Sequence, residues 1–262
     1  MPIARVNDID IHYRTDGRRD RPCLMFSNSL GTDLRMWQAQ AEAFSADFHV
    51  IRYDTRGHGR SASPPGPYSL PQLGQDALAL LDFLEIERTH FCGLSMGGVI
   101  AQWLGIHAPQ RIGKLVIANS AARVGTEQGW RERAALARSA GLDGIAAGAA
   151  ARWFGADFAA RQPERVEDML ATLRGGSAEG YAACCDALAG ADLRQDIQAI
   201  PNPTLIVVGA IDPVTTAVDA ALMQGQIRAA RTVTLPASHL SSVEAAAAFN
   251  QALRQFLNAD QT

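Results

Sequence analysis

The stretch from Thr89 to His107, THFCGLSMGGVIAQWLGIH, constrains the fold of this chain more than any other. It begins with a short apolar run, turns with glycines on both sides of Ser95, and continues with apolar residues at helical spacing. A strand, a sharp turn and a helix with serine at the apex are the setting in which Gly-x-Ser-x-Gly presents a nucleophile. The alternative interpretation is a glycine-rich turn whose serine has no chemical role.

The glycines of this turn have a steric explanation. The turn forces the serine backbone into a sparsely allowed conformation and brings the strand and the helix close together. We therefore expect Gly93 and Gly97 to occupy positions from which side chains are excluded. The Met96 N–H, at the start of the helix, is expected to point toward negative charge that develops beside Ser95.

Composition limits the class of protein. A length of 262 residues suits one large α/β domain or a domain with an insertion. The hydrophobic content of 47% and charged content of 19% are typical of globular proteins. A formal net charge of −3 gives no reason to expect a nucleic acid or an anionic membrane as a partner.

The cysteines and the N-terminus bear on the cellular compartment. The four cysteines, of which Cys184 and Cys185 are adjacent, lack the spacing of metal ligands. The N-terminal residues have no apolar signal core, and no uncharged apolar run reaches the ~20 residues that span a bilayer. We therefore expect reduced thiols, no membrane span and a cytoplasmic protein.

Hydrophobic periodicity predicts strands that alternate with helices. Residues 3–14 alternate around Asn7-Asp8, which predicts a hairpin at a sheet edge with His12 solvated on its polar face. Buried strands are expected at residues 23–26, 48–53, 89–92, 114–118, 204–208 and 232–235. Amphipathic helices separate them, and the last helix is expected over residues 243–257. This pattern predicts an α/β fold with a mostly parallel, doubly wound sheet.

The pattern changes in the middle of the chain, where strand signals vanish. Helices are expected around residues 130–139, 144–154, 163–173 and 178–188. Helices inserted between two strand–helix units predict a cap, or lid, over the carboxyl end of the sheet. We therefore expect residues 1–121 and 192–262 to form the core and residues 122–191 to form the helical cap.

Three candidate catalytic residues follow different strands of the expected sheet. Ser95, Asp212 and His239 occur in the chain order of a serine nucleophile, an acid and a histidine base. His239 would take the proton of Ser95, and Asp212 would orient the imidazole and stabilise its charged form. The alternatives are a helix N-cap for Asp212 and a loop histidine bonded to backbone for His239.

Two further groups belong to the expected site. The oxyanion of a tetrahedral intermediate needs two donors, for which we expect the backbone N–H groups of Met96 and Leu30. His58, in the polar glycine-rich loop of residues 54–61, is a rival candidate for the base. We otherwise expect that loop to be structural, with its charges paired internally.

These residues resemble those of the α/β-hydrolase superfamily. The matching motifs are the loop Asp54-Thr55-Arg56-Gly57-His58-Gly59-Arg60-Ser61, the turn Gly93-Leu94-Ser95-Met96-Gly97-Gly98, and the loops of Asp212 and His239. Within the superfamily, the run from Ser27 to Trp37 and the sequence Ser238-His239-Leu240-Ser241 resemble the 3-oxoadipate enol-lactonases. The resemblance covers essentially the whole chain.

The resemblance implies an α/β-hydrolase fold and hydrolysis of 3-oxoadipate enol-lactone to 3-oxoadipate, within bacterial breakdown of aromatic compounds by the β-ketoadipate pathway. The substrate would be a small anionic lactone, and neither a metal nor an organic cofactor would be required. Some relatives carry a fused decarboxylase domain. Because this chain ends at Thr262, we expect the lactonase alone.

The substrate carboxylate would need a cationic partner in the cap. Arg131, Arg133 and Arg152 are candidates, because a guanidinium binds a carboxylate through two parallel hydrogen bonds. The alternative is that each lies on a solvated helix face. Trp130 and Trp153 are candidates for the pocket wall, whereas Trp37 is expected in the core.

Other functions fit the same scaffold. One alternative is another serine hydrolase, such as a general esterase, a carbon–carbon bond hydrolase or a cofactor-free haloperoxidase of the perhydrolase type. A different class of alternative is a receptor that keeps the fold and binds a small ligand without catalysis. The presence of Ser95, Asp212 and His239 together favours an enzyme.

Overall fold

The computed structural model describes residues 2–259. Its strands are β1 (Ile3–Val6), β2 (Ile9–Asp16), β3 (Cys23–Ser27), β4 (His49–Tyr53), β5 (Thr89–Leu94), β6 (Ile112–Ala118), β7 (Thr204–Gly209) and β8 (Ala230–Leu235). They form an eight-stranded sheet in the order β1-β2-β4-β3-β5-β6-β7-β8. The hairpin β1–β2 pairs antiparallel with β4, and the strands from β4 to β8 are parallel. The mostly parallel sheet is confirmed.

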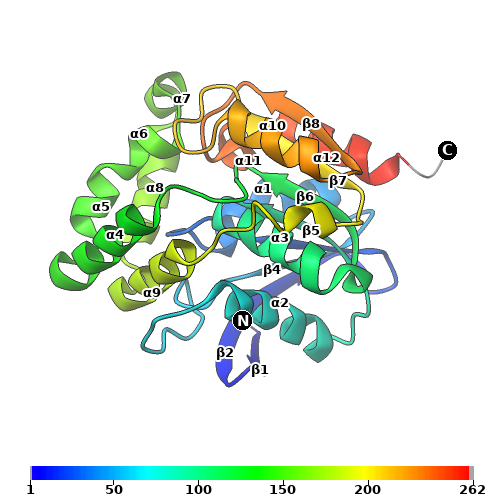
Figure 1. The fold of residues 1–262 in the computed structure, drawn as a ribbon, viewed down its shortest axis with the longest axis horizontal. Coiled ribbons are helices and arrows are strands. Elements are labelled where there is room, and N and C mark those ends of the chain that lie inside the picture. Colours follow the sequence, from blue (N-terminus) through cyan, green and yellow to red (C-terminus); the bar gives the residue numbers. More distant parts are fainter. Residues whose placement is uncertain (1, 260–262) are drawn as a thin grey trace.

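Helices cover both faces of the sheet (Figure 1). On one face, α1 (Gln38–Phe44) packs against α12 (Ala246–Asn258). On the other face lie α2 (Leu70–Phe83), α3 (Met96–His107) and α10 (Ala217–Gln226). Every residue of β3, β4 and β7 is buried, as expected for parallel strands that are covered on both sides.

The cap is the helical segment between β6 and β7, which Figure 1 shows gathered to one side of the sheet. Its helices are α4 (Glu127–Ala140), α5 (Asp143–Ala147), α6 (Ala149–Trp153), α7 (Ala156–Arg161), α8 (Pro163–Arg174) and α9 (Ala178–Ala189). The single helix predicted over residues 144–154 was wrong, because Gly148 separates α5 from α6. The short helix α7, of which only Phe158 is buried, was not predicted.

The predicted helix over residues 243–257 is also divided. A short helix α11 (Ser241–Glu244) precedes α12, and Ala245 between them leaves the helical conformation at φ −121° and ψ 46°. The Glu244 side chain at this break accepts a hydrogen bond from the Ser238 N–H at 2.8 Å. The chain therefore turns back onto the loop that carries His239 before the last helix begins.

The N-terminal hairpin contradicts one prediction. His12 is not solvated, because only 4% of it is exposed and its Nδ1 lies 2.7 Å from Asp54 Oδ2. The loop after β4 folds over β2, with the Ala62 N–H bonded to the Asp10 carbonyl oxygen at 2.8 Å. The polar face of the hairpin is therefore covered by a segment distant in sequence.

The same loop pairs its charges mainly with other elements. The Arg56 guanidinium makes two hydrogen bonds of 2.7 Å to the Asp76 carboxylate on α2, and Asp54 pairs with His12 on β2. The Arg60 N–H does donate to Asp54 within the loop, at 2.9 Å. The prediction of internal pairing was therefore wrong for Arg56. The loop instead joins β2, β4 and α2.

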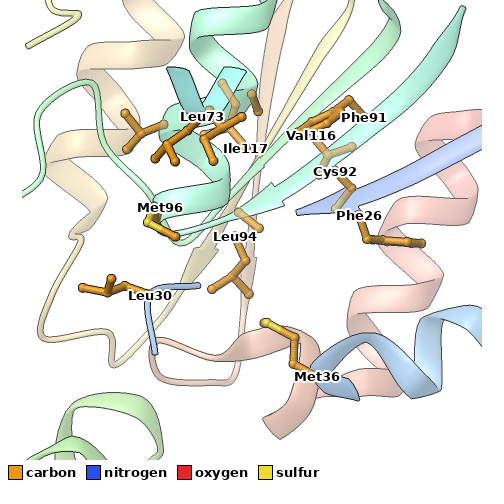
Figure 2. Packing of buried hydrophobic residues seen from close by; sticks show 14 of the residues in the cluster. Phe26, Leu30, Met36, Leu73, Phe91, Cys92, Leu94, Met96, Val116 and Ile117 are labelled. Atoms are coloured by element: carbon orange, nitrogen blue, oxygen red, sulfur yellow. The ribbon is translucent and has the colours of Figure 1, made fainter. Parts of the chain in front are cut away.

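The hydrophobic core lies between the sheet and its helices. Figure 2 shows Phe26, Phe91, Cys92 and Val116 packed along the central strands. Trp37 is fully buried as predicted, with its ring centroid 4.7 Å from that of Phe26. The four cysteines are free and buried, which confirms the expected thiols. In the described part of the chain, no helix is long and apolar enough to cross a membrane.

Candidate active site

Ser95 lies at the tight turn between β5 and α3. Its backbone has φ 56° and ψ −114°, a strained conformation for a residue with a side chain. A Cβ atom at Gly93 would collide with the carbonyl oxygen of Gly97, and one at Gly97 would collide with that of Ser27 on β3. The predicted steric role of both glycines is confirmed. The Ser95 N–H donates to the Ala118 carbonyl oxygen at 2.9 Å, which ties the turn to β6.

The three residues predicted as a catalytic set lie within hydrogen-bonding distance. His239 Nε2 is 2.9 Å from Ser95 Oγ, and His239 Nδ1 is 2.9 Å from Asp212 Oδ2. Ser95 follows β5, Asp212 follows β7 and His239 follows β8, so the carboxyl ends of three parallel strands bring them together. All three are buried. This geometry suits transfer of the serine proton to the imidazole.

Asp212 is held as a carboxylate by several donors. Burial raises its pKa, but hydrogen bonds from His239, from the Asn119 side chain and from the Val214 N–H outweigh this effect and lower the pKa to about 2. An ionised Asp212 accepts a hydrogen bond from His239 Nδ1–H, which keeps the proton on Nδ1 and leaves the Nε2 lone pair directed at the serine hydroxyl. The alternative of a helix N-cap is wrong, because Thr216 and Asp219 form the capping box of α10.

The predicted oxyanion donors lie on two different segments beside Ser95. Leu30 is on the loop after β3, and Met96 begins α3, as Figure 2 shows near the end of β5. The Gly97 N–H donates to the Asn28 carbonyl oxygen at 3.0 Å and holds the two segments together. Within residues 2–259, neither the Leu30 N–H nor the Met96 N–H donates a hydrogen bond, so both remain available to an oxyanion.

A cavity of about 340 Å³ lies between Ser95 and the cap. Ser95, Leu30 and His239 line it, together with the predicted pocket residues Trp130, Arg133, Arg152 and Trp153. Arg131 does not line it. That side chain is exposed and pairs with Glu127 one turn earlier on α4, at 2.7 Å, so its assignment to the pocket was wrong.

The two cavity arginines, Arg133 and Arg152, lack an acidic partner among residues 2–259. In the described structure, neither Arg133 nor Arg152 forms an ion pair with a carboxylate. Burial lowers the pKa of Arg152, and the nearby charge of Arg133 lowers it further. Arg133 lies over the Trp130 ring, 5.2 Å from its centroid. The cavity that Ser95 lines therefore also carries positive charge without a carboxylate partner in the described structure, and it favours an anionic ligand.

His58, the rival candidate for the base, is engaged elsewhere. Its Nε2 accepts the Gly31 N–H at 2.8 Å, and its Nδ1 lies 3.3 Å from the Arg56 carbonyl oxygen. Both ring nitrogens are therefore occupied, whereas His239 Nε2 faces Ser95. The geometry favours His239 as the base.

Two polar residues that sequence reasoning missed support the site. Asn119 donates to Asp212 Oδ2 at 3.0 Å and to the Ser238 carbonyl oxygen at 3.1 Å. Glu244 accepts hydrogen bonds from the N–H groups of Ser238 and Gly155, and so connects the histidine loop to the cap. The position of Asn119 directly after a buried strand was the available signal, because polar residues there face the carboxyl edge of the sheet.

The chain is similar to known hydrolases over most of its length. A family described as an alpha/beta hydrolase fold matches residues 22–246. The protein 3-oxoadipate enol-lactonase 2 of Acinetobacter baylyi is 50% identical over 246 residues, which cover 94% of this chain and 92% of that protein. The 3-oxoadipate enol-lactonase 1 of the same organism is 42% identical over 251 residues, which cover 96% of this chain and 94% of that protein.

A solved structure agrees with these relatives. The crystal structure of the enol-lactonase from Burkholderia xenovorans LB400 matches with a TM-score of 0.96 and 42% identity, over 98% of this chain and 99% of that one. Together with the sequence matches, it identifies the chain as a carboxylic ester hydrolase. The chain belongs to the α/β-hydrolase family, and within that family its sequence resembles the 3-oxoadipate enol-lactonases.

Proposed function

We propose that this protein opens 3-oxoadipate enol-lactone to 3-oxoadipate through an acyl-enzyme on Ser95. The observation that carries the proposal is a single cavity that joins the Ser95–His239 pair to two arginines without carboxylate partners in the described structure. The similarity to enol-lactonases supports the same substrate. In this proposal residues 122–191 form the cap over a core of residues 1–121 and 192–262, and the enzyme works in the cytoplasm in aromatic catabolism.

The first step forms the acyl-enzyme. His239 Nε2 takes the proton as Ser95 Oγ attacks the lactone carbonyl carbon, and Asp212 stabilises the imidazolium that results. The Leu30 and Met96 N–H groups bind the oxyanion of the tetrahedral intermediate. When this intermediate collapses, the ring carbon–oxygen bond breaks and His239 returns the proton to the enol oxygen. Because the leaving group is part of the ring, it stays attached to the acyl chain.

The second step releases the product. The enol tautomerises to a ketone, and a water molecule that His239 deprotonates attacks the acyl carbon. Collapse of the second tetrahedral intermediate breaks the bond to Ser95 Oγ, to which His239 returns the proton it took from water. The new carboxyl group loses its proton to solvent, and a dicarboxylate is freed. Water is the only co-substrate, and the serine, histidine and aspartate return to their starting protonation states.

The cap recognises the substrate's carboxylate arm. Arg133 and Arg152 both line the cavity, and their guanidinium groups can bind a carboxylate through paired hydrogen bonds. A neutral ester lacks this anchor. Orientation of the lactone carbonyl toward Ser95 therefore depends on charge at the far end of the substrate, which favours a small anionic lactone over a simple ester.

Turnover of the enol-lactone by wild type and by Ser95→Ala tests the proposal, with neutral aryl esters assayed alongside. Loss of the nucleophile should reduce kcat by about 10⁴-fold or more for every substrate. The wild type should prefer the enol-lactone in kcat/KM. Hydrolysis of aryl esters without lactone turnover would contradict the substrate and favour a general esterase. Undiminished lactone turnover by Ser95→Ala would contradict the mechanism.

A further inference from the structure

His58 is buried against the loop that carries Leu30, and the reaction sequence above gives it no role. Its Nε2 accepts the N–H of Gly31, the residue directly after Leu30, at 2.8 Å. The ring also lies 6.5 Å from the Tyr181 ring, which belongs to the cap. A buried imidazole that contacts both the oxyanion loop and the cap is placed to influence the geometry of the reaction.

The Gly31 contact fixes the tautomer of His58. A backbone N–H can only donate, so Nε2 must carry a lone pair and the ring proton must be on Nδ1. That proton points to the Arg56 carbonyl oxygen, 3.3 Å away. Burial lowers the pKa of His58, which keeps the ring neutral and preserves the acceptor at Nε2.

The rest of the loop is anchored through other atoms. Asn28 accepts from the Gly97 N–H at 3.0 Å and donates its side-chain amide to the Tyr53 carbonyl oxygen at 2.9 Å. The Leu34 N–H donates to Asp54 Oδ1 at 2.8 Å. Between these anchors, Thr32 donates its N–H and its Oγ1–H to the Ser29 carbonyl oxygen at 3.2 and 2.8 Å, and His58 accepts the N–H of the next peptide, which joins Leu30 to Gly31.

The cap also lies close to Gly31. Gly31 has φ +80°, and a Cβ there would lie 2.8 Å from Leu173 Cδ1 and 3.3 Å from Tyr181 Cε2. Both of these cap residues line the cavity. The Leu30–Gly31 peptide therefore lies against the imidazole of His58 and close to two residues of the cavity wall.

We propose that His58 is a positioning residue that aligns the Leu30 N–H for the oxyanion by accepting the Gly31 N–H. The inference rests on the proposed function in one respect, because it takes the Leu30 N–H as an oxyanion donor. The Leu30 N–H belongs to the Ser29–Leu30 peptide, and Thr32 holds that peptide through the Ser29 carbonyl oxygen. Without the His58 acceptor, the next peptide can rotate about the shared Leu30 Cα, and the Leu30 N–H shifts from the position where the oxyanion forms within the limits of the Thr32 contacts. Such a shift weakens binding of the transition state more than binding of the ester.

The variants His58→Leu and His58→Gln test this role. His58→Leu removes the acceptor and should lower kcat by about 10- to 100-fold with KM within about twofold, because outright loss of an oxyanion donor costs ~10²–10³. His58→Gln places a carbonyl oxygen near the position of Nε2 and should recover most of the loss. Rescue by glutamine separates positioning from the mere filling of space.

His90→Leu is the matched control. His90 Nδ1 likewise accepts a backbone N–H, that of Lys114 at 2.9 Å, but at the amino end of β5, opposite Ser95. His90→Leu loses a comparable hydrogen bond, so it should lower Tm and leave kcat unchanged. His58→Leu should lower kcat by more than its loss of stability, measured as the change in Tm, can account for.

The assay uses a small aryl ester, so that failure of the lactone assignment leaves the test intact. Failure of the serine mechanism is detected separately, as full activity of Ser95→Ala. A folded His58→Leu with wild-type kcat, or a His58→Gln no better than His58→Leu, would overturn the positioning role. Should His58→Leu not fold, ¹⁵N NMR of histidine-labelled wild type decides: the Nδ1–H tautomer is expected at His58, and the Nε2–H tautomer overturns the inference.

Discussion

Arg133 and Arg131 are two residues apart on α4, yet they face different surroundings. Two residues along a helix correspond to a rotation of roughly 200°, so their side chains leave opposite sides. Arg133 lines the cavity with Ser95, while Arg131 pairs with Glu127 in solvent. This contrast supplies an internal control for the role of charge in substrate binding.

Arg133→Ala and Arg152→Ala should each raise KM for an anionic lactone, by about tenfold, through loss of charge-assisted hydrogen bonds worth roughly 1.5–3 kcal/mol. KM for a neutral aryl ester should change less than about twofold, because that substrate has no carboxylate. Steady-state kinetics on both substrates measure the difference. Arg131→Ala should leave both KM values unchanged. Equal effects of Arg133→Ala on the two substrates would contradict carboxylate recognition.

The loops at the carboxyl ends of β5, β6, β7 and β8 act as one assembly. Asn119, after β6, bonds to Asp212 and to the Ser238 carbonyl oxygen, and so connects the loops after β7 and β8. The cap joins the same assembly, because the Leu240 N–H donates to the Trp153 carbonyl oxygen at 2.9 Å. The wall of the cavity and the loop of His239 are therefore attached to each other.

Elements with a strong local signal could be predicted from the sequence. The strands β3, β5, β6 and β7 are largely apolar, and the Ser95 turn needs two glycines for steric reasons that hold in any protein. The meeting of Ser95, Asp212 and His239 followed from the rule that parallel strands place loops at a common edge. These predictions depended on hydrophobic periodicity, which is a local property of the sequence. They also depended on a general rule about where loops lie in parallel sheets.

Features that depend on contacts distant in sequence could not be predicted. The burial of His12 depends on a loop that begins at Asp54, on another strand. The α4 helix has mostly exposed residues, so its sequence did not say whether Arg131 or Arg133 faces the cavity. The role of His58 requires knowledge of which backbone donor lies above it. In each case tertiary packing decides between alternatives that look equal along the chain.

At the scale of the whole molecule, the fold favours the neutral form of three histidines. Burial lowers the pKa of His90 to about 4 from an ordinary value of 6.5, and also lowers the pKa values of His49 and His58. Between pH 4 and pH 6.5, the unfolded chain therefore binds more protons than the folded protein. The free energy of unfolding should therefore be fully retained above pH 6.5 and should fall as the pH drops toward 4.

Thermal unfolding across this pH range measures the effect. His90→Asn keeps an acceptor oxygen near the position of Nδ1 but cannot take up a proton. Between pH 6.5 and 4, Tm of the wild type should fall about 5–10 °C further than Tm of the variant. Parallel curves for the two proteins would show that His90 does not contribute to acid unfolding.

Rapid-quench mass spectrometry of the intact protein with the enol-lactone tests the central claim most directly. Because ring opening leaves the enol attached to the acyl chain, the intermediate should weigh as much as the protein plus the whole lactone. Peptide mapping should place that mass on Ser95, and Ser95→Ala should acquire none. Steady lactone turnover with no covalent intermediate at any quench time, or an adduct on another residue, would contradict the account.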